Sequence, residues 1–525
     1  MRIWKKYSEE ISDEKFDAIV IGSGMGGLTT AALLSKAGKR VLVLERHFKV
    51  GGFTHTFKRS NYEWDVGIHY IGGVQRENLV LRRLFDYVTD GNLHWHHMED
   101  VYDRIIFPDK SYDLVAGKNN FFQKLCGYFP EEENAITQYL KLVRESVKSG
   151  MAFFGNRALP SALSAVTYPF MSRKYLKLSN QTTMEVLSNL TGNRKLIGVL
   201  TGQFGDYGLP PSQSSFAMHA SVVHHYLNGG SYPVGGARSI AETIAPVINQ
   251  SGGVILVSTP VEEILTTGNK ATGVRLSNGD ELTAPLIISN AGVHTTFNHL
   301  IKNSTFSNRK VNKITPSCSH ICLYIGLKHT AKELGLSTTN LWIYPDYDHD
   351  KNIENYNSDP SAPLPVTYVS FPSSKDPEWD KNHPGTATME AIGFAPYEWF
   401  EKWKDTQWKK RDDEYESFKE KLTHRLMENV YKHVPQIEGK VDYLELSTPL
   451  TTKEFTGYNK GEIYGIDHTP QRFRERWLKP KTPIKNLYLT GQDIVTVGLA
   501  SALIAGFLTT SVILKKNIMK DILND

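Results

Sequence analysis

The chain has 525 residues, 40% hydrophobic and 22% charged, which is typical of a globular protein with two or three domains. Its 60 lysines and arginines and 56 aspartates and glutamates give a net charge of +4 without a long block of one sign, which excludes the basic face of a nucleic-acid-binding protein. Three cysteines are too few for a disulfide framework and fit a reducing compartment.

The first predicted element is a βαβ unit over residues 16–45. It begins with an apolar strand, Ala18 to Ile21, which runs into Gly22, Gly24 and Gly27 in G-x-G-x-x-G spacing. A helix-forming run, Leu28 to Leu34, follows, and then a second strand, Val41 to Leu44, which ends at Glu45. The glycines permit a tight turn and a close approach to a pyrophosphate, which lies at the positive end of the helix. Glu45 follows Gly27 by 18 residues, where a carboxylate binds an adenosine ribose. The unit predicts a bound dinucleotide, either flavin or nicotinamide.

The middle of the chain changes character. Residues 76–230 carry amphipathic patterns broken by prolines, which indicates a largely helical region. Residues 252–289 instead predict a β-meander, with turns at Gly268-Asn269 and Asn278-Gly279 and a buried strand from Leu286 to Ser289.

The last part of the chain returns to the pattern of its start. Residues 301–479 mix strands with a charged helix near 412–432, and a buried strand is predicted from Asn486 to Thr490. The 21 residues from Ile494 to Leu514 carry no charge, which is enough by length for a transmembrane helix. Cofactor-type elements thus occur at the start, middle and end of the chain, so we expect two interleaved domains.

Four segments carry a resemblance to a known family. They are Asp65 to Gly73 (DVGIHYIGG), Tyr207 to Ala220 (YGLPPSQSSFAMHA), Ser231 to Ile248 (SYPVGGARSIAETIAPVI) and Asn486 to Gly506 (NLYLTGQDIVTVGLASALIAG). Together with the glycine motif, they resemble the flavoprotein superfamily of phytoene desaturases, carotenoid isomerases and amine oxidases, and within it the retinol saturase branch. The resemblance covers nearly the whole chain.

This resemblance implies an α/β fold in which a Rossmann-type FAD-binding domain, like those of glutathione reductase and amine oxidases, is interleaved with a mixed α+β substrate domain. The FAD-binding domain would comprise residues 1–75, 231–300 and 480–525, and the substrate and membrane-contact domain residues 76–230 and 301–479. In this fold the apolar segment 494–514 is a buried helix rather than a membrane span. Its prefix Gly491-Gln492-Asp493, together with Gly498, suits a helix N-terminus that faces an electron-rich flavin edge.

FAD is the implied cofactor, and the resemblance assigns its contacts position by position. The pyrophosphate would be held by Gly22, Ser23, Gly24, Met25, Gly26 and Gly27, the adenosine ribose by Glu45 and Arg46, and the flavin-side phosphate and ribityl chain by Gly51, Gly52, Phe53 and Thr54. Adenine would meet Val261, the ribityl or pyrophosphate region Gly491 and Asp493, and the flavin ring Val497, Gly498 and Leu499. A second G-x-G-x-x-G motif is not evident, so NAD(P)H remains a candidate only as a transient reductant.

The implied chemistry needs a proton as well as a hydride. Reduced flavin delivers the hydride, and an isolated polyene has no carbonyl to polarise, so a side chain or solvent must supply the proton. The candidate donors are histidines and tyrosines expected near the flavin, namely His69, Tyr70, His219, His224, Tyr232 and Tyr464. Each has an alternative structural role as a hydrogen-bond partner of the backbone or the flavin edge.

The functional hypothesis is an FAD-dependent oxidoreductase that acts on a carbon–carbon double bond of a polyene or isoprenoid lipid, saturating it as retinol and carotenoid saturases do. A carotenoid desaturase or cis–trans isomerase is the alternative, because fold and flavin contacts do not separate these reactions. A non-catalytic lipid escort of the Rab GDP-dissociation-inhibitor type is a third hypothesis. The intact glycines, Glu45 and Asp493 argue against it.

Further features concern location and partners. Residues 151–177 combine apolar side chains with a basic end, which fits either an element that dips into one leaflet or a core helix. Basic residues between 472 and 481 fit a solvated loop or a headgroup contact. The charged N-terminus lacks the apolar core of a secretory signal, so we expect a cytoplasmic protein, with peripheral membrane contact as an alternative. The histidines at 94–97 match no zinc spacing, so no metal is expected, and nothing in the sequence indicates an oligomeric state.

Overall fold

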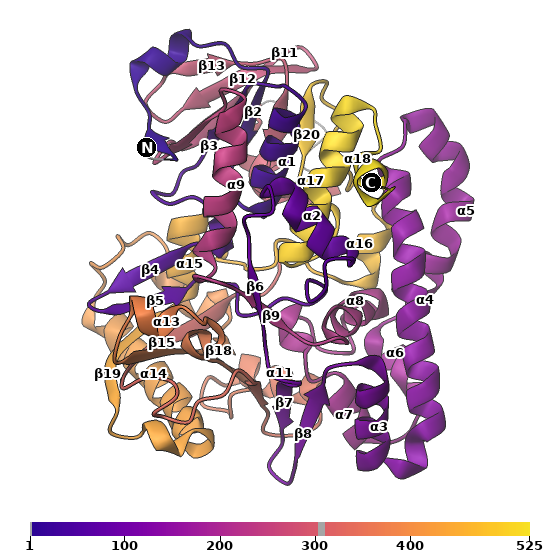
Figure 1. Cartoon of the computed structure of the whole chain (residues 1–525), viewed down its shortest axis with the longest axis vertical. Helices are drawn as coiled ribbons and strands as arrows, with labels where there is room; N and C mark the ends of the chain where they lie inside the picture. The colour runs from indigo at the N-terminus through magenta and orange to yellow at the C-terminus, as the bar shows by residue number, and fades with distance from the viewer. Residues whose placement is uncertain (1–2, 303–309, 525) are drawn as a thin grey trace.

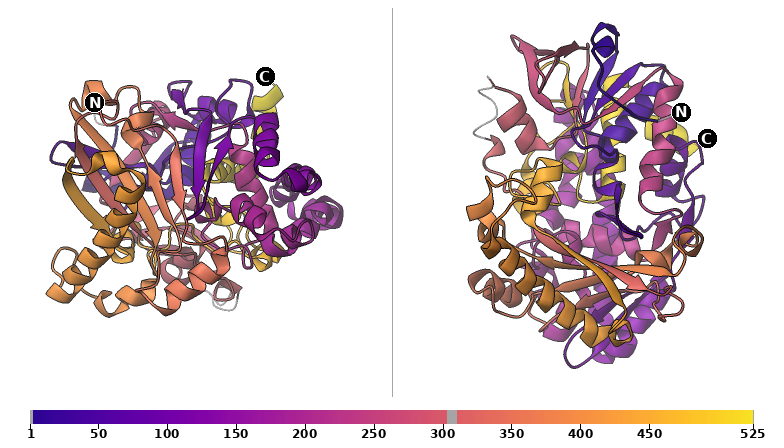
Figure 2. Two further views of the ribbon diagram at one scale, coloured as in Figure 1. Left: turned by 90° about the horizontal axis from the view of Figure 1, so that it is seen from below. Right: turned by 90° about the vertical axis from the view of Figure 1, so that its left-hand side faces the viewer.

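The chain forms two halves, each built around a β-sheet. The computed structural model describes residues 3–302 and 310–524, so residues 1–2, 303–309 and 525 of the predicted domains lie outside the described residues. A parallel sheet lies in the upper half of Figure 1 and a mixed sheet in the lower half. The right-hand view of Figure 2 shows the same separation, and the left-hand view shows two long helices standing out to one side.

The parallel sheet has the strand order β1-β10-β3-β2-β14-β20 within the described residues. In that order its strands are Lys5–Lys6, Val254–Val257, Val41–Leu44, Ala18–Ile21, Ile287–Ser289 and Leu487–Leu489. The strands β2, β3 and β14 are buried along their whole length, which explains why their sequences are continuous apolar runs. The sheet therefore takes its strands from the start, middle and end of the chain, as predicted, whereas the exact domain limits stay a prediction.

Three helices pack together beside this sheet. The helix α1 (Met25–Lys36) contacts both α9 (Arg238–Gln250) and α17 (Leu499–Leu514). A Cβ atom on Gly506 would lie 2.5 Å from the side chain of Thr29, so glycine is what lets α17 approach α1 closely. The apolar segment is thus a packed helix, as predicted.

Within the described residues, no single helix is long and apolar enough to cross a bilayer. The pair α17 and α18 (Ile518–Asn524) reaches the required length and composition together, but the two helices are bent by 111°.

The predicted meander is present beside the parallel sheet. Its antiparallel strands are β11 (Val261–Thr267), β12 (Lys270–Leu276) and β13 (Glu281–Thr283), separated by the two predicted turns. The meander places the first residue of β11, Val261, at the wall of the cavity described below.

The mixed sheet has the order β19-β15-β18-β17-β16-β7-β8 within the described residues. Its strands are Val441–Ser447, His320–Lys328, Thr386–Phe394, Thr367–Ser370, Asn340–Ile343, Val101–Ile106 and Ser111–Val115. The predicted charged helix is α14 (Asp413–His433), which packs on β17 and β18. Within the described residues, the other α-helices of this part are α11 (His349–Ser358), α12 (Pro372–Lys375), α13 (Trp379–Asn382), α15 (Pro449–Thr456) and α16 (Pro470–Arg474).

The region 76–230 is largely helical, as predicted. Its helices are α2 (Val80–Val88), α3 (Lys118–Tyr128), α4 (Glu133–Arg157), α5 (Ser161–Ser179), α6 (Thr183–Ser188), α7 (Arg194–Leu200) and α8 (Phe216–Tyr226). The prediction missed the hairpin of β7 and β8, whose parallel pairing with β16 adds this region to the mixed sheet.

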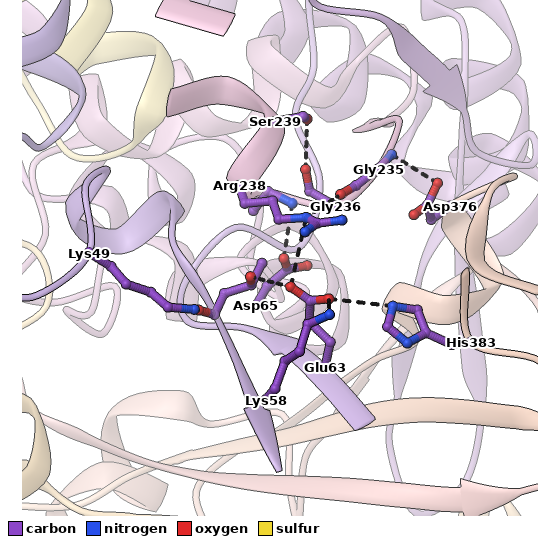
Figure 3. A network of polar contacts seen from close by, with 12 residues as sticks. Lys49, Lys58, Glu63, Asp65, Gly235, Gly236, Arg238, Ser239, Asp376 and His383 are labelled. Atoms are coloured by element: carbon purple, nitrogen blue, oxygen red, sulfur yellow. Dashed lines mark hydrogen bonds and ion pairs between the residues drawn. The ribbon is translucent and has the colours of Figure 1, made fainter. Parts of the chain in front are cut away.

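A second hairpin, β4 (Thr56–Arg59) and β5 (Tyr62–Asp65), connects the two halves. The indole of Trp64 donates a hydrogen bond to the carbonyl of Ile325 at 3.1 Å, which fixes the hairpin to the mixed sheet. Figure 3 shows its polar side, where Glu63 meets the cations Lys58 and Arg238 as well as His383. The hairpin thus holds the segment after residue 65 between the two sheets.

Candidate functional site

A cavity of about 830 Å³ lies between the two sheets, lined by residues of both halves. One group of lining residues comes from the loops that follow β2, β3 and β14 and from the start of α17. In parallel sheets, ligands bind at the carboxyl ends of the strands, and this group occupies that position. A second group comes from the helical region and the mixed sheet and includes the rings of Tyr226, Tyr324, Trp342, Tyr368 and Phe394.

The glycine loop after β2 is packed so tightly that side chains would not fit. A Cβ atom on Gly27 would lie 2.1 Å from the carbonyl oxygen of Gly22, and one on Gly26 would lie 2.6 Å from the backbone of Gly491. Gly24 caps the N-terminus of α1 and lines the cavity together with Gly22, Met25 and Gly26. The free N–H groups of α1 therefore begin at the cavity wall, where they suit a pyrophosphate.

Glu45 ends β3 with its carboxylate held in place by three donors. The backbone N–H and the hydroxyl of Ser23 donate to Oε2 at 2.8 and 2.6 Å, and the N–H of His47 donates to Oε1 at 2.8 Å. Ser23 also accepts a hydrogen bond from the N–H of Gly51 at 3.2 Å. Ser23 does not line the cavity, and it acts by joining the first glycine loop to the second. Glu45 and Arg46 do line it.

The predicted flavin-side residues lie in the same wall. Gly51, Gly52, Phe53, Thr54, Val261, Gly491, Val497, Gly498 and Leu499 all line the cavity. Gly51 and Gly24 form a backbone bridge between the two glycine loops, and a Cβ on Gly491 would lie 2.4 Å from the side-chain oxygen of Asn290. The loops form a cradle that side chains would fill, and this cradle fits an extended dinucleotide such as FAD.

Asp493 has a more structural position than the sequence indicated. Its Oδ2 accepts a hydrogen bond from the N–H of Val293 at 2.7 Å, and its Oδ1 accepts one from the N–H of Ile466 at 3.2 Å. It lines the cavity with 4% of its surface exposed. Its carboxylate thus fixes the loop after β14 to the segment before α17, and its contact with a ribityl chain stays a prediction.

Arg472 is buried, unlike the solvated loop or headgroup contact predicted for the basic run at 472–481. It is 3% exposed, and its guanidinium donates hydrogen bonds to the backbone carbonyls of Ile466, Gln492, Asp493 and Val495. Burial lowers the pKa of Arg472 to about 10. The cation holds the loop that precedes α17 in a single conformation.

Three of the predicted proton donors line the cavity: His69, Tyr70 and Tyr464. The Nδ1 atom of His69 lies 2.8 Å from Oε2 of Glu390, whose side chain is fully buried. Burial lowers the pKa of His69 to about 3 and raises that of Glu390 to about 8. The Tyr464 hydroxyl donates to the carbonyl of Gly205 at 2.8 Å.

The other three predicted donors are not among the residues that line the cavity. His219 is buried between the hydroxyls of Tyr139 and Tyr207, at 2.8 and 3.2 Å from its ring nitrogens. His224 is exposed, and the hydroxyl of Tyr232 donates a hydrogen bond to the carboxyl group of Asp65. The catalytic roles of these three residues therefore stay predictions without support from position.

Other lining residues had no assigned role in the sequence. Asn290 follows the buried strand β14 directly, a position that is itself a signal for a ligand contact in parallel sheets. Asp206, Tyr226, Trp342 and Tyr368 also line the cavity. They come from four separate elements, and no local pattern would have grouped them.

The histidine group at 94–97 has ordinary structural partners. Nδ1 of His96 lies 3.0 Å from the carbonyl of Lys375, and Nδ1 of His97 lies 3.0 Å from the hydroxyl of Ser231. Over the part of the chain that the structure describes, no group of three or more histidine, cysteine or acidic side chains is placed to hold a metal ion.

Comparison with known proteins places this geometry in a family. The model of the flavin-containing amine oxidoreductases matches residues 25–508. The all-trans-retinol 13,14-reductases of Danio rerio and Homo sapiens are 37% and 38% identical, and the alignments cover 96% and 97% of this chain and 87% of each relative. Prolycopene isomerase 2 of an Oncidium hybrid is 26% identical over 86% of this chain and 75% of that protein.

A solved structure supports the same fold. Wild-type putrescine oxidase bound to putrescine superimposes with a TM-score of 0.62 at 14% identity, covering 96% of this chain and 100% of that one. With the α/β architecture and the glycine cradle, these matches show that the chain belongs to the flavin-containing amine oxidoreductase family, in the branch of the all-trans-retinol 13,14-reductases.

Proposed function

We propose that this protein binds FAD in the central cavity and reduces a carbon–carbon double bond of a polyene or isoprenoid lipid. The observation that carries the proposal is that one cavity joins a dinucleotide cradle to a wall of aromatic side chains. The cradle suits the cofactor, and the aromatic wall suits a flat hydrocarbon. The names of the 37–38% identical relatives favour retinol as the first substrate to test.

The cradle residues have distinct roles in this proposal. The N-terminus of α1, at Gly24 and Met25, would stabilise the pyrophosphate with its free N–H groups and its positive dipole end. Glu45 would accept hydrogen bonds from the adenosine ribose, since its carboxylate is already oriented by Ser23 and His47. When bound and reduced, FAD supplies the hydride.

The proton would come from a side chain on the opposite wall. His69 is the best placed of the predicted donors, because it lines the cavity and its Nδ1 lies within hydrogen-bond distance of a buried carboxyl group. His69 can pass on the proton that neutral Glu390 carries, and the negative charge that remains after the transfer would then lie on the Glu390 carboxylate near Lys375. Tyr226 and Tyr368 would exclude water from the reacting atoms.

We also propose that α4 and α5 provide a peripheral membrane contact for uptake of the lipid. The apolar side chains of Met151, Val166 and Phe170 are 70%, 71% and 82% exposed. Arg173 and Lys174 follow on α5, which suits an interface with anionic headgroups. Water-soluble NAD(P)H is proposed only as a transient reductant of the flavin.

The function can be tested by following flavin and product together. Purified protein reconstituted with FAD is reduced anaerobically and mixed with retinol or with carotenoids. Reoxidation of the flavin with a product two hydrogens heavier supports saturation. An unchanged mass with a new isomer indicates an isomerase. In a parallel anaerobic sample with oxidised FAD, reduction of the flavin together with a product two hydrogens lighter indicates a desaturase. Flavin that stays reduced in the presence of every polyene contradicts the proposal.

A further inference from the structure

Two carboxyl groups, the buried Asp103 and the partly buried Asp206, meet the same tyrosine at the aromatic part of the cavity. The hydroxyl of Tyr70 lies 2.8 Å from Oδ2 of Asp103 and 3.4 Å from Oδ2 of Asp206. A phenol has one proton, which it donates along the shorter contact. The longer contact therefore holds a hydrogen bond only if Asp206 supplies the proton.

Asp103 is placed to remain an acceptor. It is fully buried, and besides Tyr70 it accepts a hydrogen bond from the amide of Gln203 at 2.7 Å and one from the amide of Asn340 at 2.9 Å. Burial raises the pKa of Asp103, and its three hydrogen-bond donors and the nearby Lys375, which donates to the same Asn340 side chain, act in the opposite direction. Three donors and a nearby cation thus stabilise a carboxylate at this position.

Asp206 has none of this compensation. Within the described residues, its only side-chain hydrogen bond is the long contact with Tyr70, and its Oδ1 has no donor. Burial and repulsion from Asp103 raise the pKa of Asp206 well above its usual range. The pKa of both acids is raised, and because Asp103 accepts from three donors whereas Asp206 has one long contact, the hydrogen-bond geometry favours Asp206 as the protonated acid.

The surroundings of Asp206 are otherwise aromatic. The ring of Tyr226 stacks on that of Tyr70 with centroids 4.1 Å apart. A Cβ on Gly205 would lie 2.5 Å from the indole of Trp342, so this glycine lets the indole pack beside Asp206. Tyr368 is 5% exposed and lines the same cavity, and its hydroxyl makes no hydrogen bond of ordinary geometry to the described residues. Polar groups with unused hydrogen-bonding capacity thus interrupt an apolar wall.

We propose that Asp206, as a neutral carboxylic acid, is the specificity residue that receives the hydroxyl group of an alcohol-terminated polyene. A neutral acid can donate one hydrogen bond to an alcohol oxygen and accept one from its proton. The same acid disfavours a pure hydrocarbon, because its polar oxygens would then be covered without a partner. This inference rests on the proposed function, since it concerns the orientation of the polyene within that cavity.

The test compares retinol with the matched hydrocarbon in which hydrogen replaces the hydroxyl group. Binding of each to the FAD-loaded protein is measured by quenching of protein fluorescence for the wild type, Asp206→Leu, Asp206→Asn and the control Asp109→Asn, which changes an exposed acid of the β7–β8 loop. We expect the wild type and the control to prefer retinol by about ten-fold or more. Asp206→Leu should remove that preference, and Asp206→Asn, which keeps a donor and an acceptor, should retain part of it.

The outcomes separate this inference from the proposed function. A wild type that binds both ligands equally, or an Asp206→Leu variant that keeps the preference for retinol, overturns the role of Asp206 but leaves polyene binding intact. A wild type that binds neither ligand overturns the proposed function and this inference with it. Flavin absorbance and the melting temperature of each variant confirm folding. Infrared difference spectra provide a second readout, because the carbonyl band of protonated acids should lose one component in both Asp206→Asn and Asp206→Leu and stay unchanged in Asp109→Asn.

Discussion

His69 and Glu390 form a buried pair with Nδ1 and Oε2 2.8 Å apart. Their positions differ, since His69 lines the cavity whereas Glu390 lies on β18 behind it with no exposed side-chain surface. Burial favours the neutral form of both groups, so the carboxyl group of Glu390 carries a proton close to the imidazole, without a hydrogen bond of ordinary geometry between the two. The pair therefore places an exchangeable proton behind the cavity wall.

Replacement of His69 should separate catalysis from cofactor binding. His69→Gln is expected to lower kcat by about 10²-fold, the usual effect of removing a general acid, with FAD retained. The control His224→Gln changes an exposed histidine outside the cavity wall and should leave kcat within about two-fold. Stopped-flow reoxidation of reduced flavin by the polyene provides the measurement. Equal rates for His69→Gln and the wild type would exclude His69 as the donor.

Glu390 should make stability dependent on pH. Because burial raises its pKa from 4.5 to about 8, the folded protein binds this proton more tightly than the unfolded chain. The stabilising contribution is complete below the unfolded pKa and is lost as the pH rises through the folded pKa. Glu390→Gln has no such proton. The Tm of this variant minus the Tm of the wild type should therefore increase as the pH is raised from about 5 to about 9. A constant difference in Tm across this range would show that Glu390 does not titrate with a raised pKa.

Arg472 should be essential for the loop before α17. In Arg472→Met the carbonyls that accept from the guanidinium lose their buried donor, and each unsatisfied acceptor costs about 1–3 kcal/mol. We expect a lower Tm and faster loss of FAD on dilution. Arg474→Ala, on the exposed side of the same helix, should change stability by less than about 0.5 kcal/mol. Thermal unfolding with and without added FAD distinguishes the two, and equal behaviour of the variants would refute the role given to Arg472.

Gly27 should tolerate no side chain. In Gly27→Ala the new Cβ would lie 2.1 Å from the Gly22 carbonyl, so α1 must move away from β2 and the cradle opens. The variant is expected to lose FAD or to fail to accumulate as folded protein. The control Gly127→Ala lies near the end of α3 with nothing within 4 Å of the added atom, and should be stable or more stable by up to about 1 kcal/mol. Flavin content per protein measures both, and full flavin content in Gly27→Ala would contradict this account.

The exposed surface of α5 should decide membrane binding. The double variant Val166→Ser and Phe170→Ser removes two side chains that are 71% and 82% exposed, and its affinity for vesicles should fall by at least about ten-fold. Leu444→Ser alters a 40% exposed side chain of β19, far from α5 in Figure 1, and serves as the control. Co-sedimentation with phosphatidylcholine and phosphatidylserine vesicles gives the measurement. If the double variant binds vesicles as the wild type does, α5 is not the contact.

The half of the molecule built on the parallel sheet was predictable because its sequence signals are local. The strands Ala18–Ile21 and Val41–Leu44 have the predicted bounds, since a fully buried parallel strand is an uninterrupted apolar run. Glycines at fixed offsets identify the loop, because backbone contact leaves no room for a Cβ. The meander turns were equally readable from Gly268-Asn269 and Asn278-Gly279.

The half built on the mixed sheet, with its aromatic side of the cavity, was not predictable in the same way. The strand β7 has four buried positions among its six residues but no strict alternation, and it lies in a region whose other patterns are helical. Asp206 and Asn340 are linked through Tyr70 and Asp103. These four residues come from four distant segments, so no spacing in the sequence predicts the network. Arg472 appeared to belong to a surface run because burial of a cation depends on carbonyls that the fold brings to it.

The order of the strands also has a consequence for biosynthesis. The hydroxyls of Thr30 and Thr490 lie 3.1 Å apart although 460 residues separate them, and β14 pairs with both β2 and β20. After the first glycine loop has been synthesised, nearly all residues of the mixed-sheet half must therefore be synthesised before the parallel sheet can be completed. Domains usually fold as units during synthesis. Here the N-terminal strands of the parallel sheet can complete their pairing only after the C-terminal strand has been synthesised. Cofactor capture is therefore expected only after the segment containing β20 and α17 has emerged, and a nascent chain stalled before it should remain colourless.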